Sequence, residues 1–294
     1  PEAKNPLFNR FLQALLPPGS TFKPFTALMG LDSGVITPQT VFPYEIVNNV
    51  WYPNPNSTSW AIRRQPFASA TGPLNLKRAI MWSDNIYFAW VASKLESQAF
   101  TDYAKLFTMD EAVTFDLSVA KPQISNTGSI DTLALLLDSA YGQGEMLITP
   151  LQLSAMYGIF ANGNMMKPYV VKSLNDTVDG RHVPTSTKSA EIWKSSPVDY
   201  DNIEIVRDIM VSTVASGTAG SASVSGMKIA GKTGTAQMGS TDRAIGWYVG
   251  YVLEGGKKYI VTVCADGPTD DVSAKFPVAK GIFEFLKYSD ENEE

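Results

Sequence analysis

The 294-residue sequence contains a single cysteine and a single histidine, and this scarcity excludes several kinds of site. A Ser-His-Asp triad needs a histidine base, and a zinc site needs several His or Cys ligands. His182 lies in a turn-like stretch that predicts a surface position, and Cys264 lies in an apolar, strand-like run that predicts a buried, inert thiol. Any hydrolase or acyl transferase built from this chain must therefore take its base from another residue type.

The sequence also lacks a basic block, a long apolar run and a glycine-rich phosphate loop. The net charge is −5, so nucleic acid is excluded as a partner, because phosphate binding needs clustered Lys and Arg. No run approaches the ~20 apolar residues of a membrane span, and no signal peptide is present. The chain opens at Pro1 without Met, which predicts a fragment whose membrane anchor lies outside it.

The 44% hydrophobic content is enough for a substantial core, and its patterning predicts helices in the first two thirds of the chain. Thr149 and Pro150 provide a helix cap and a first helical residue. The expected helices are 5–16, 20–34, 74–81, 85–95, 98–107, 149–161, 199–215 and 273–287, with a long loop at 37–73. Strands are expected at 227–238, 243–253 and 258–265. This order predicts an α+β fold, an antiparallel sheet flanked by helices, rather than a parallel βαβ fold.

The first motif is Ser20-x-x-Lys23, which follows Pro17-Pro18-Gly19 at an expected helix start. Residues three apart on a helix are neighbours, and the helix start favours a developing oxyanion. Burial disfavours the charged form of lysine, so its pKa falls and a neutral amine can take a serine proton. Taken alone, the same pattern also fits a capping serine and a snorkelling lysine.

The second motif is Ser83-Asp84-Asn85, which interrupts apolar sequence between two expected helices and also fits an ordinary N-cap. The third is Lys232-Thr233-Gly234-Thr235, in an expected strand. Glycine inside a strand often marks the close approach of a ligand or another backbone, although a bulged edge strand would explain it equally.

The three motifs together are far more specific than any one of them, because S-x-x-K, S-D-N and K-T-G in this order are typical of serine β-lactamases and penicillin-binding proteins. Over nearly its whole length the sequence resembles the transpeptidase domain of a class B, high-molecular-weight penicillin-binding protein. The stretch 141–153 is similar to the segment that precedes a long helix in that family, and 123–126 resembles its low-affinity, methicillin-resistance-type members. The resemblance implies a β-lactamase/transpeptidase-like fold with a mostly helical subdomain inserted at about 35–150.

Two features separate this sequence from related enzymes. A class A β-lactamase would carry an E-x-x-L-N pattern before K-T-G, and a class D enzyme or its sensor relatives would carry S-x-V in place of Ser83-Asp84-Asn85. Both comparisons favour an enzyme that passes its acyl group to an amine. A β-lactam-sensing receptor domain, an inactive cell-wall scaffold and a β-lactamase remain as alternatives. Family members also carry strands just before S-x-x-K, so one or two strands of the sheet are expected to lie outside this fragment.

The resemblance implies a role for each motif residue in a peptidoglycan D,D-transpeptidase. Ser20 would attack the penultimate D-Ala of a stem peptide, and neutral Lys23 would receive its proton. Ser83, aided by Lys232, would relay a proton to the leaving D-Ala. Asn85 would hydrogen-bond Lys23 and the substrate amide.

Further residues are expected around the substrate. Thr233, Gly234 and Thr235, with Lys232, would form the row that holds the terminal carboxylate. The N–H groups of Ser20 and Thr235 would form the oxyanion hole, while Asp84 would brace its loop. Pocket-rim candidates are Tyr141, Gln143, Trp51, Tyr52 and Trp60, and Trp247 fits either the pocket wall or the core.

No cofactor and no metal are expected for this chemistry. The implied ligands are peptidoglycan stem peptides and β-lactam antibiotics, which would acylate Ser20 and stay bound. The full-length protein is expected at the extracytoplasmic face of a bacterial membrane, working with division or elongation machinery.

Overall fold

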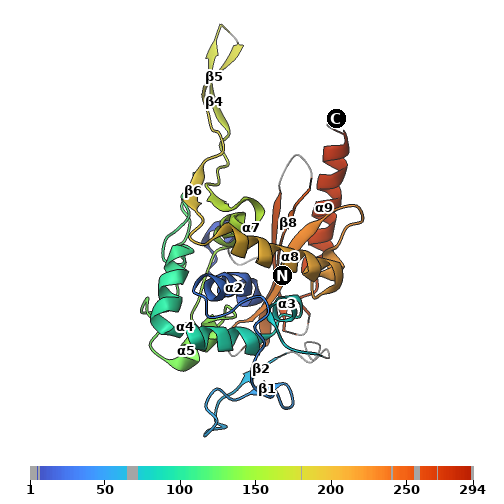
Figure 1. Ribbon diagram of the computed structural model, residues 1–294. Coiled ribbons are helices and arrows are strands. Elements are labelled where there is room, and N and C mark those ends of the chain that lie inside the picture. The colour runs from blue at the N-terminus through green and yellow to red at the C-terminus, as the bar shows by residue number, and fades with distance from the viewer. Residues whose placement is uncertain are drawn as a thin grey trace.

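The computed structural model describes residues 5, 7–64, 72–179, 181–239, 241–254, 259–269 and 271–292 (Figure 1). In these ranges, none of the helices is long and apolar enough to cross a membrane.

A three-stranded antiparallel sheet, β7 (Ile229–Gln237), β8 (Arg243–Val252) and β9 (Ile260–Pro268), forms one side of the molecule in that order. β8 is buried along almost its whole length because it lies in the middle and is covered on both faces. The long helix α9 (Lys275–Asn292) packs on β8 and β9, where Tyr248 and Phe283 meet edge to face, and α8 (Tyr200–Ser216) packs on β7. The predicted α+β class with an antiparallel sheet is confirmed.

The helix α2 (Lys23–Asp32) lies at the centre of the helical part and is buried all round, as a helix apolar on every face should be. Its Phe25 ring contacts Phe107, Tyr157 and Phe160 at centroid distances of 5.2–5.5 Å. The other elements of this part are α3 (Leu76–Met81), α4 (Asn85–Leu106), α5 (Leu133–Ser139), α6 (Pro150–Met156) and α7 (Gly158–Asn162).

The two helices expected at 85–95 and 98–107 are both present as the two halves of α4, which meet at a kink where Glu96 has a non-helical backbone with a φ of 65°. Another helix differs from the sequence-based expectation. The single helix expected at 149–161 is instead broken at Tyr157 into α6 and α7. Gly158, the first residue of α7, lies so close to the carbonyl of Asn164 that a side chain there would collide with it, so glycine permits this contact.

The helix expected at 5–16 is wrong for most of its length, because only α1 (Arg10–Gln13) forms. Leu16 instead exchanges two backbone hydrogen bonds with Ile148, at 3.0 and 2.9 Å. The two prolines that follow also disfavour helix in the residue before them. Tertiary pairing and proline therefore override the local apolar pattern.

Three two-stranded sheets form between described residues outside the expected strands. β3 (Asn164–Met166) pairs with β6 (Ile192–Ser195), and between them the hairpin of β4 (Ser173–Val178) and β5 (Arg181–Thr187) projects far from the body (Figure 1). At the opposite end, β1 (Val50–Trp51) pairs with β2 (Ile62–Arg63) inside the expected 37–73 loop, of which 65–71 lie outside the described residues. His182 lies in β5, and its side chain also lies outside the described part.

Cys264 corrects the prediction of a buried thiol, because it is exposed. It lies on β9, the outer strand of the described sheet, where alternate side chains face away from the helices. Local desolvation of the sulfur and the nearby Asp266 nevertheless raise the pKa of the thiol, so it stays protonated at neutral pH.

Candidate active site

A pocket of about 960 Å³ lies between the sheet and the helical part, and residues of all three motifs line it. The predicted site residues on its wall are Ser20, Ser83, Asn85, Tyr141, Gln143, Thr233, Gly234 and Thr235. Lys23 and Lys232 are completely buried and reach the pocket residue Ser83 with their amines. The fold therefore brings together side chains that are far apart in the sequence.

Ser20 lies in the short 3₁₀ turn η1 (Gly19–Thr21), directly before α2. Gly19 has a φ of 55°, which glycine adopts without strain, and its N–H donates to the Gly142 carbonyl at 2.8 Å. Gly142 also has a positive φ, and a side chain on it would collide with the backbone of Gly19. The turn that carries Ser20 is thus held against the loop that carries Tyr141 and Gln143.

Three side chains fix the chain around the nucleophile. The Thr21 hydroxyl donates to the Pro18 carbonyl at 2.6 Å, and the Tyr157 hydroxyl donates to the Thr21 carbonyl at 2.7 Å. The indole N–H of Trp247 donates to the Pro17 carbonyl at 2.9 Å. Trp247 is completely buried and does not line the pocket, so its assignment to the pocket wall is corrected. It is a core residue that anchors the approach to Ser20.

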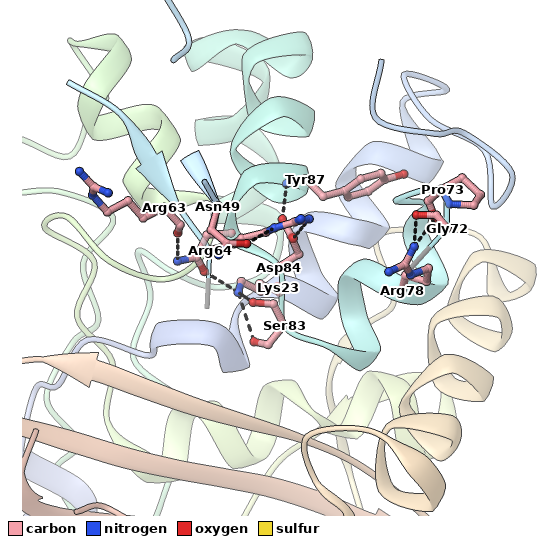
Figure 2. Close-up of polar contacts among 11 residues, drawn as sticks. Lys23, Asn49, Arg63, Arg64, Gly72, Pro73, Arg78, Ser83, Asp84 and Tyr87 are labelled. Atoms are coloured by element: carbon pink, nitrogen blue, oxygen red, sulfur yellow. Dashed lines mark hydrogen bonds and ion pairs between the residues drawn. The ribbon is translucent and has the colours of Figure 1, made fainter. Parts of the chain in front are cut away.

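Lys23 is the first residue of α2, and its buried amine lies 5.9 and 6.0 Å from the ring centroids of Phe88 and Tyr141. It donates to the Ser83 carbonyl at 2.5 Å and to Asn85 Oδ1 at 2.7 Å, and it lies 3.2 Å from Ser83 Oγ (Figure 2). Burial lowers the pKa of Lys23 to about 7, although the nearby Asp84 charge opposes the shift. Lys23 is therefore able to exist as a neutral amine at physiological pH.

The Ser83-Asp84-Asn85 turn is held by the side chain of its middle residue. Asp84 is completely buried, caps α4 by accepting from the Tyr87 N–H at 3.0 Å, and pairs with Arg64 at 3.3 Å (Figure 2). Ser83 has a φ of 58°, a strained conformation for serine that this bracing maintains. Asn85 Nδ2 donates to the Arg63 carbonyl at 3.0 Å, so its oxygen is oriented toward Lys23.

Asp84→Asn is expected to move the acid limb of the pH dependence of acylation to lower pH, by up to about one unit. The Asp84 charge raises the pKa of Lys23, so removing it lowers that pKa further below about 7. Neutral Lys23 then persists to more acidic pH. Asparagine caps helices as well as aspartate does, which preserves α4. The measurement is the rate constant for labelling by a fluorescent penicillin between pH 5 and 8.

The matched control for this change is Asp102→Asn, which removes an exposed carboxylate near the other end of α4 and should keep the wild-type profile. An unchanged or raised acid limb in Asp84→Asn would show that Lys23 does not set this limb.

Lys232 lies on β7 and donates to Ser83 Oγ at 2.9 Å and to the Thr233 carbonyl at 2.9 Å. Burial, and then the charges of Lys23 and Lys275, hold its pKa well below the ordinary lysine range. The Ser83 hydroxyl therefore lies between two lysine amines. A hydroxyl in this position can accept a proton from one amine while it donates its own to another atom.

The strand β7 pairs with β8 on one edge and faces η1 with the other. At Gly234 a side chain would lie only 3.1–3.2 Å from Thr21 and the Pro18 carbonyl, so glycine permits the close approach of the strand to the nucleophile turn. The hydroxyl of Thr233 donates to Thr218 Oγ1 at 3.2 Å, while Thr235 is exposed on the pocket wall.

The remaining rim candidates divide into two groups. Tyr141 and Gln143 line the pocket, and the Tyr141 hydroxyl donates to Asp138. Trp51, Tyr52 and Trp60 do not line it, which corrects their assignment; Trp51 instead packs against Phe42 in the core.

Several pocket residues carry no sequence signal that could have identified them. Apart from Gly144, which lies within the 141–153 stretch, they belong to none of the motifs or stretches that carry the family resemblance: Ala61, Arg63, Trp82, Asp138, Gly144, Thr218, Gln237, Thr269, Lys275 and Phe276.

The site combines a serine in the turn before α2, a buried lysine three residues on whose pKa is lowered to about 7, and a second serine between two lysine amines. Such an arrangement has the groups that serine acyl transfer without histidine requires. The chain belongs to the penicillin-binding protein transpeptidase domain family, whose model matches residues 1–284.

Individual relatives agree with this membership. Penicillin-binding protein 3 of Bacillus subtilis is 30% identical over 290 residues, which are 96% of this chain and 41% of that protein. The peptidoglycan D,D-transpeptidase PbpA of Mycolicibacterium smegmatis is 30% identical over 279 residues, 93% of this chain and 54% of that protein. This chain thus spans about half the length of these relatives or less.

A solved structure of penicillin-binding protein A from M. tuberculosis, a ceftriaxone acyl-enzyme complex, has a TM-score of 0.79 at 25% identity, over 94% of this chain and 61% of that one. Its imipenem acyl-enzyme complex has a TM-score of 0.78 at 24% identity, over 95% and 61%. Both similarities support the fold described above.

Proposed function

We propose that this domain is a serine-type peptidoglycan D,D-transpeptidase that forms an acyl-enzyme on Ser20 and is acylated by β-lactams. The observation that carries the proposal is the placement of the Ser83 hydroxyl between the amines of Lys23 and Lys232, in the pocket that Ser20 lines. Relatives named as peptidoglycan D,D-transpeptidases support the same reaction.

The acylation step begins at Ser20. Its Oγ forms a bond to the carbonyl carbon of the penultimate D-Ala, and its proton passes to neutral Lys23. The C–N bond to the terminal D-Ala then breaks. The leaving nitrogen takes a proton from the Ser83 hydroxyl, which is replenished by its lysine partners at 3.2 and 2.9 Å.

The second step transfers the acyl group to an amine from another stem peptide. This amine attacks the ester carbon and gives up one proton to the amines around Ser83, and Ser20 Oγ leaves and recovers a proton. The net result is a new peptide bond and an unchanged enzyme. A β-lactam forms the same ester, but its ring-opened product stays attached and keeps Ser20 blocked.

The substrate is held along β7. The N–H groups of Ser20 and Thr235 form the oxyanion hole, where one donor is typically worth ~3–4 kcal/mol to the transition state. Thr233, Gly234 and Thr235 provide the row for the terminal carboxylate, and Asn85 hydrogen-bonds the substrate amide. This assignment is supported by the fact that all these residues line the same pocket.

The test is crosslinking by the purified protein on glycan strands polymerised from lipid-linked precursor, read as dimeric muropeptides by mass spectrometry. Dimers that disappear on addition of penicillin are the expected result. Acylation by penicillin without any dimer would favour a β-lactam sensor. The absence of both would favour a scaffold and overturn the proposal.

We further propose that residues 1–294 act as one transpeptidase domain, with 35–150 as its helical subdomain, and that an anchor outside this sequence holds it at the extracytoplasmic face. Peptidoglycan strands as substrate support that location. The projecting β4–β5 hairpin, with exposed Leu174 and Val183, offers a contact surface for division or elongation machinery.

A further inference from the structure

A third lysine, Lys275, lies on the pocket wall and has no role in the chemistry described above. It is the first residue of α9, only 5% of its surface is exposed, and it lines the same pocket as Ser20. Its Nζ donates to the Gly234 carbonyl at 3.0 Å and lies 3.4 Å from Thr235 Oγ1. The amine thus contacts the two β7 residues next to which a substrate carboxylate is expected.

No carboxylate balances this buried amine: the ion pairs found between described residues do not include Lys275. Its hydrogen-bond partners are a neutral carbonyl and a neutral hydroxyl. A buried cation without a counter-ion is costly, and the cost is removed when an anion binds beside it. Desolvation lowers the pKa of Lys275 to about 8, so the amine is still mostly protonated at pH 7.

Lys232, the other lysine near the carboxylate row, is less suited to provide this positive charge. Its pKa lies well below the ordinary range, and its amine is already directed to Ser83 and to the Thr233 carbonyl. The charge of Lys275 contributes to the lowered pKa of Lys232, so the two lysines have different roles. Lys232 serves proton transfer at Ser83, while Lys275 provides a fixed cation at the far side of Thr235.

We propose that Lys275 is a carboxylate-binding residue of this pocket, whose ammonium pairs with the terminal carboxylate of the ligand beside the Thr235 hydroxyl. The inference deepens the proposed function and rests on it. The ligand class is an acyl donor that carries a free carboxylate near its scissile amide, which a stem peptide and a penicillin share.

Lys275→Met tests the proposal, because it keeps the length of the side chain and removes the charge. The probes are benzylpenicillin and its methyl ester, which differ only in the carboxylate, and the readout is the acylation rate constant by intact-protein mass spectrometry. The variant should acylate about ten- to a hundredfold more slowly with benzylpenicillin, the range for a hydrogen bond to a charged group. Its rate with the methyl ester should stay within about twofold of wild type.

In the wild type, the acylation rate with benzylpenicillin divided by the rate with its methyl ester should also fall as pH rises through about 8, because Lys275 then loses its proton. Lys280→Met, on the exposed face of α9, is the matched control and should leave both rates unchanged. Equal losses with the two probes would show that Lys275 only fastens α9 to β7, and would overturn the proposal, as would no loss with either. If the wild type itself is not acylated, the proposed function fails and this assignment fails with it.

Discussion

Ser20→Ala is expected to abolish covalent labelling by a fluorescent penicillin, while the free energy of unfolding stays within about 1 kcal/mol of wild type. The reason is chemical: the ester forms on the Ser20 oxygen, and neither Lys23 nor Ser83 can replace it, because both are held in other hydrogen bonds. The turn itself is held by Gly142, Tyr157 and other backbone contacts, which the substitution leaves in place. Gel fluorescence and intact-protein mass measure the outcome.

The matched control for this variant is Ser33→Ala, at the other end of α2. The Ser33 hydroxyl donates to the Met29 carbonyl, far from the pocket residues, so labelling should be unchanged. A mass increase of one penicillin on the Ser20→Ala protein would place the nucleophile elsewhere and contradict the mechanism.

Lys23→Met should have the second-largest effect, slowing acylation by about 10²–10⁴-fold, the usual contribution of a general base. Methionine fills the same apolar space but cannot accept the Ser20 proton. In the wild type the rate should rise with pH up to about 7, because protonated Lys23 has no lone pair below that pKa. This acid limb should vanish in the variant, since its titrating group is gone.

Stability provides an independent check on Lys23→Met. The substitution removes a costly buried amine but leaves the Ser83 carbonyl and Asn85 Oδ1 without their donor, so the variant must be shown to unfold cooperatively. Lys94→Met, at an exposed position of α4, is the control. A Lys23→Met protein that labels at the wild-type rate would remove Lys23 as the base.

The parts of the fold that could be predicted are those with a local signal. Thr149 accepts from the Gln152 N–H and Pro150 occupies the first turn of α6, as the sequence pattern indicates. The turn before Ser20 is likewise determined by two prolines and a glycine, and three strands are predicted from short strand-like runs near the C-terminal end. Such features depend on neighbours within a few residues.

The parts that could not be predicted depend on contacts between distant segments. Lys275 looks like any lysine near a helix start, and its burial arises only because α9 docks against the end of β7. Trp247 gave no means to choose between core and pocket until its hydrogen bond to Pro17 was visible. The β4–β5 hairpin is largely polar and exposed, so it lacks the one-sided apolar pattern by which strands are recognised.

The contact between Gly19 and Gly142 has a consequence for how this sequence can change over time. A side chain on Gly142 would overlap the backbone of Gly19. A side chain on Gly19 would lie only 3.0 Å from the Thr235 carbonyl, and the φ of 55° at Gly19 disfavours any other residue. A mutation at one of these positions cannot be compensated at the other, because neither has an atom left to remove. Sequence variation among homologues of this domain is therefore expected to accumulate in the projecting hairpin and the 37–73 loop. Gly19 and Gly142 are expected to vary very little.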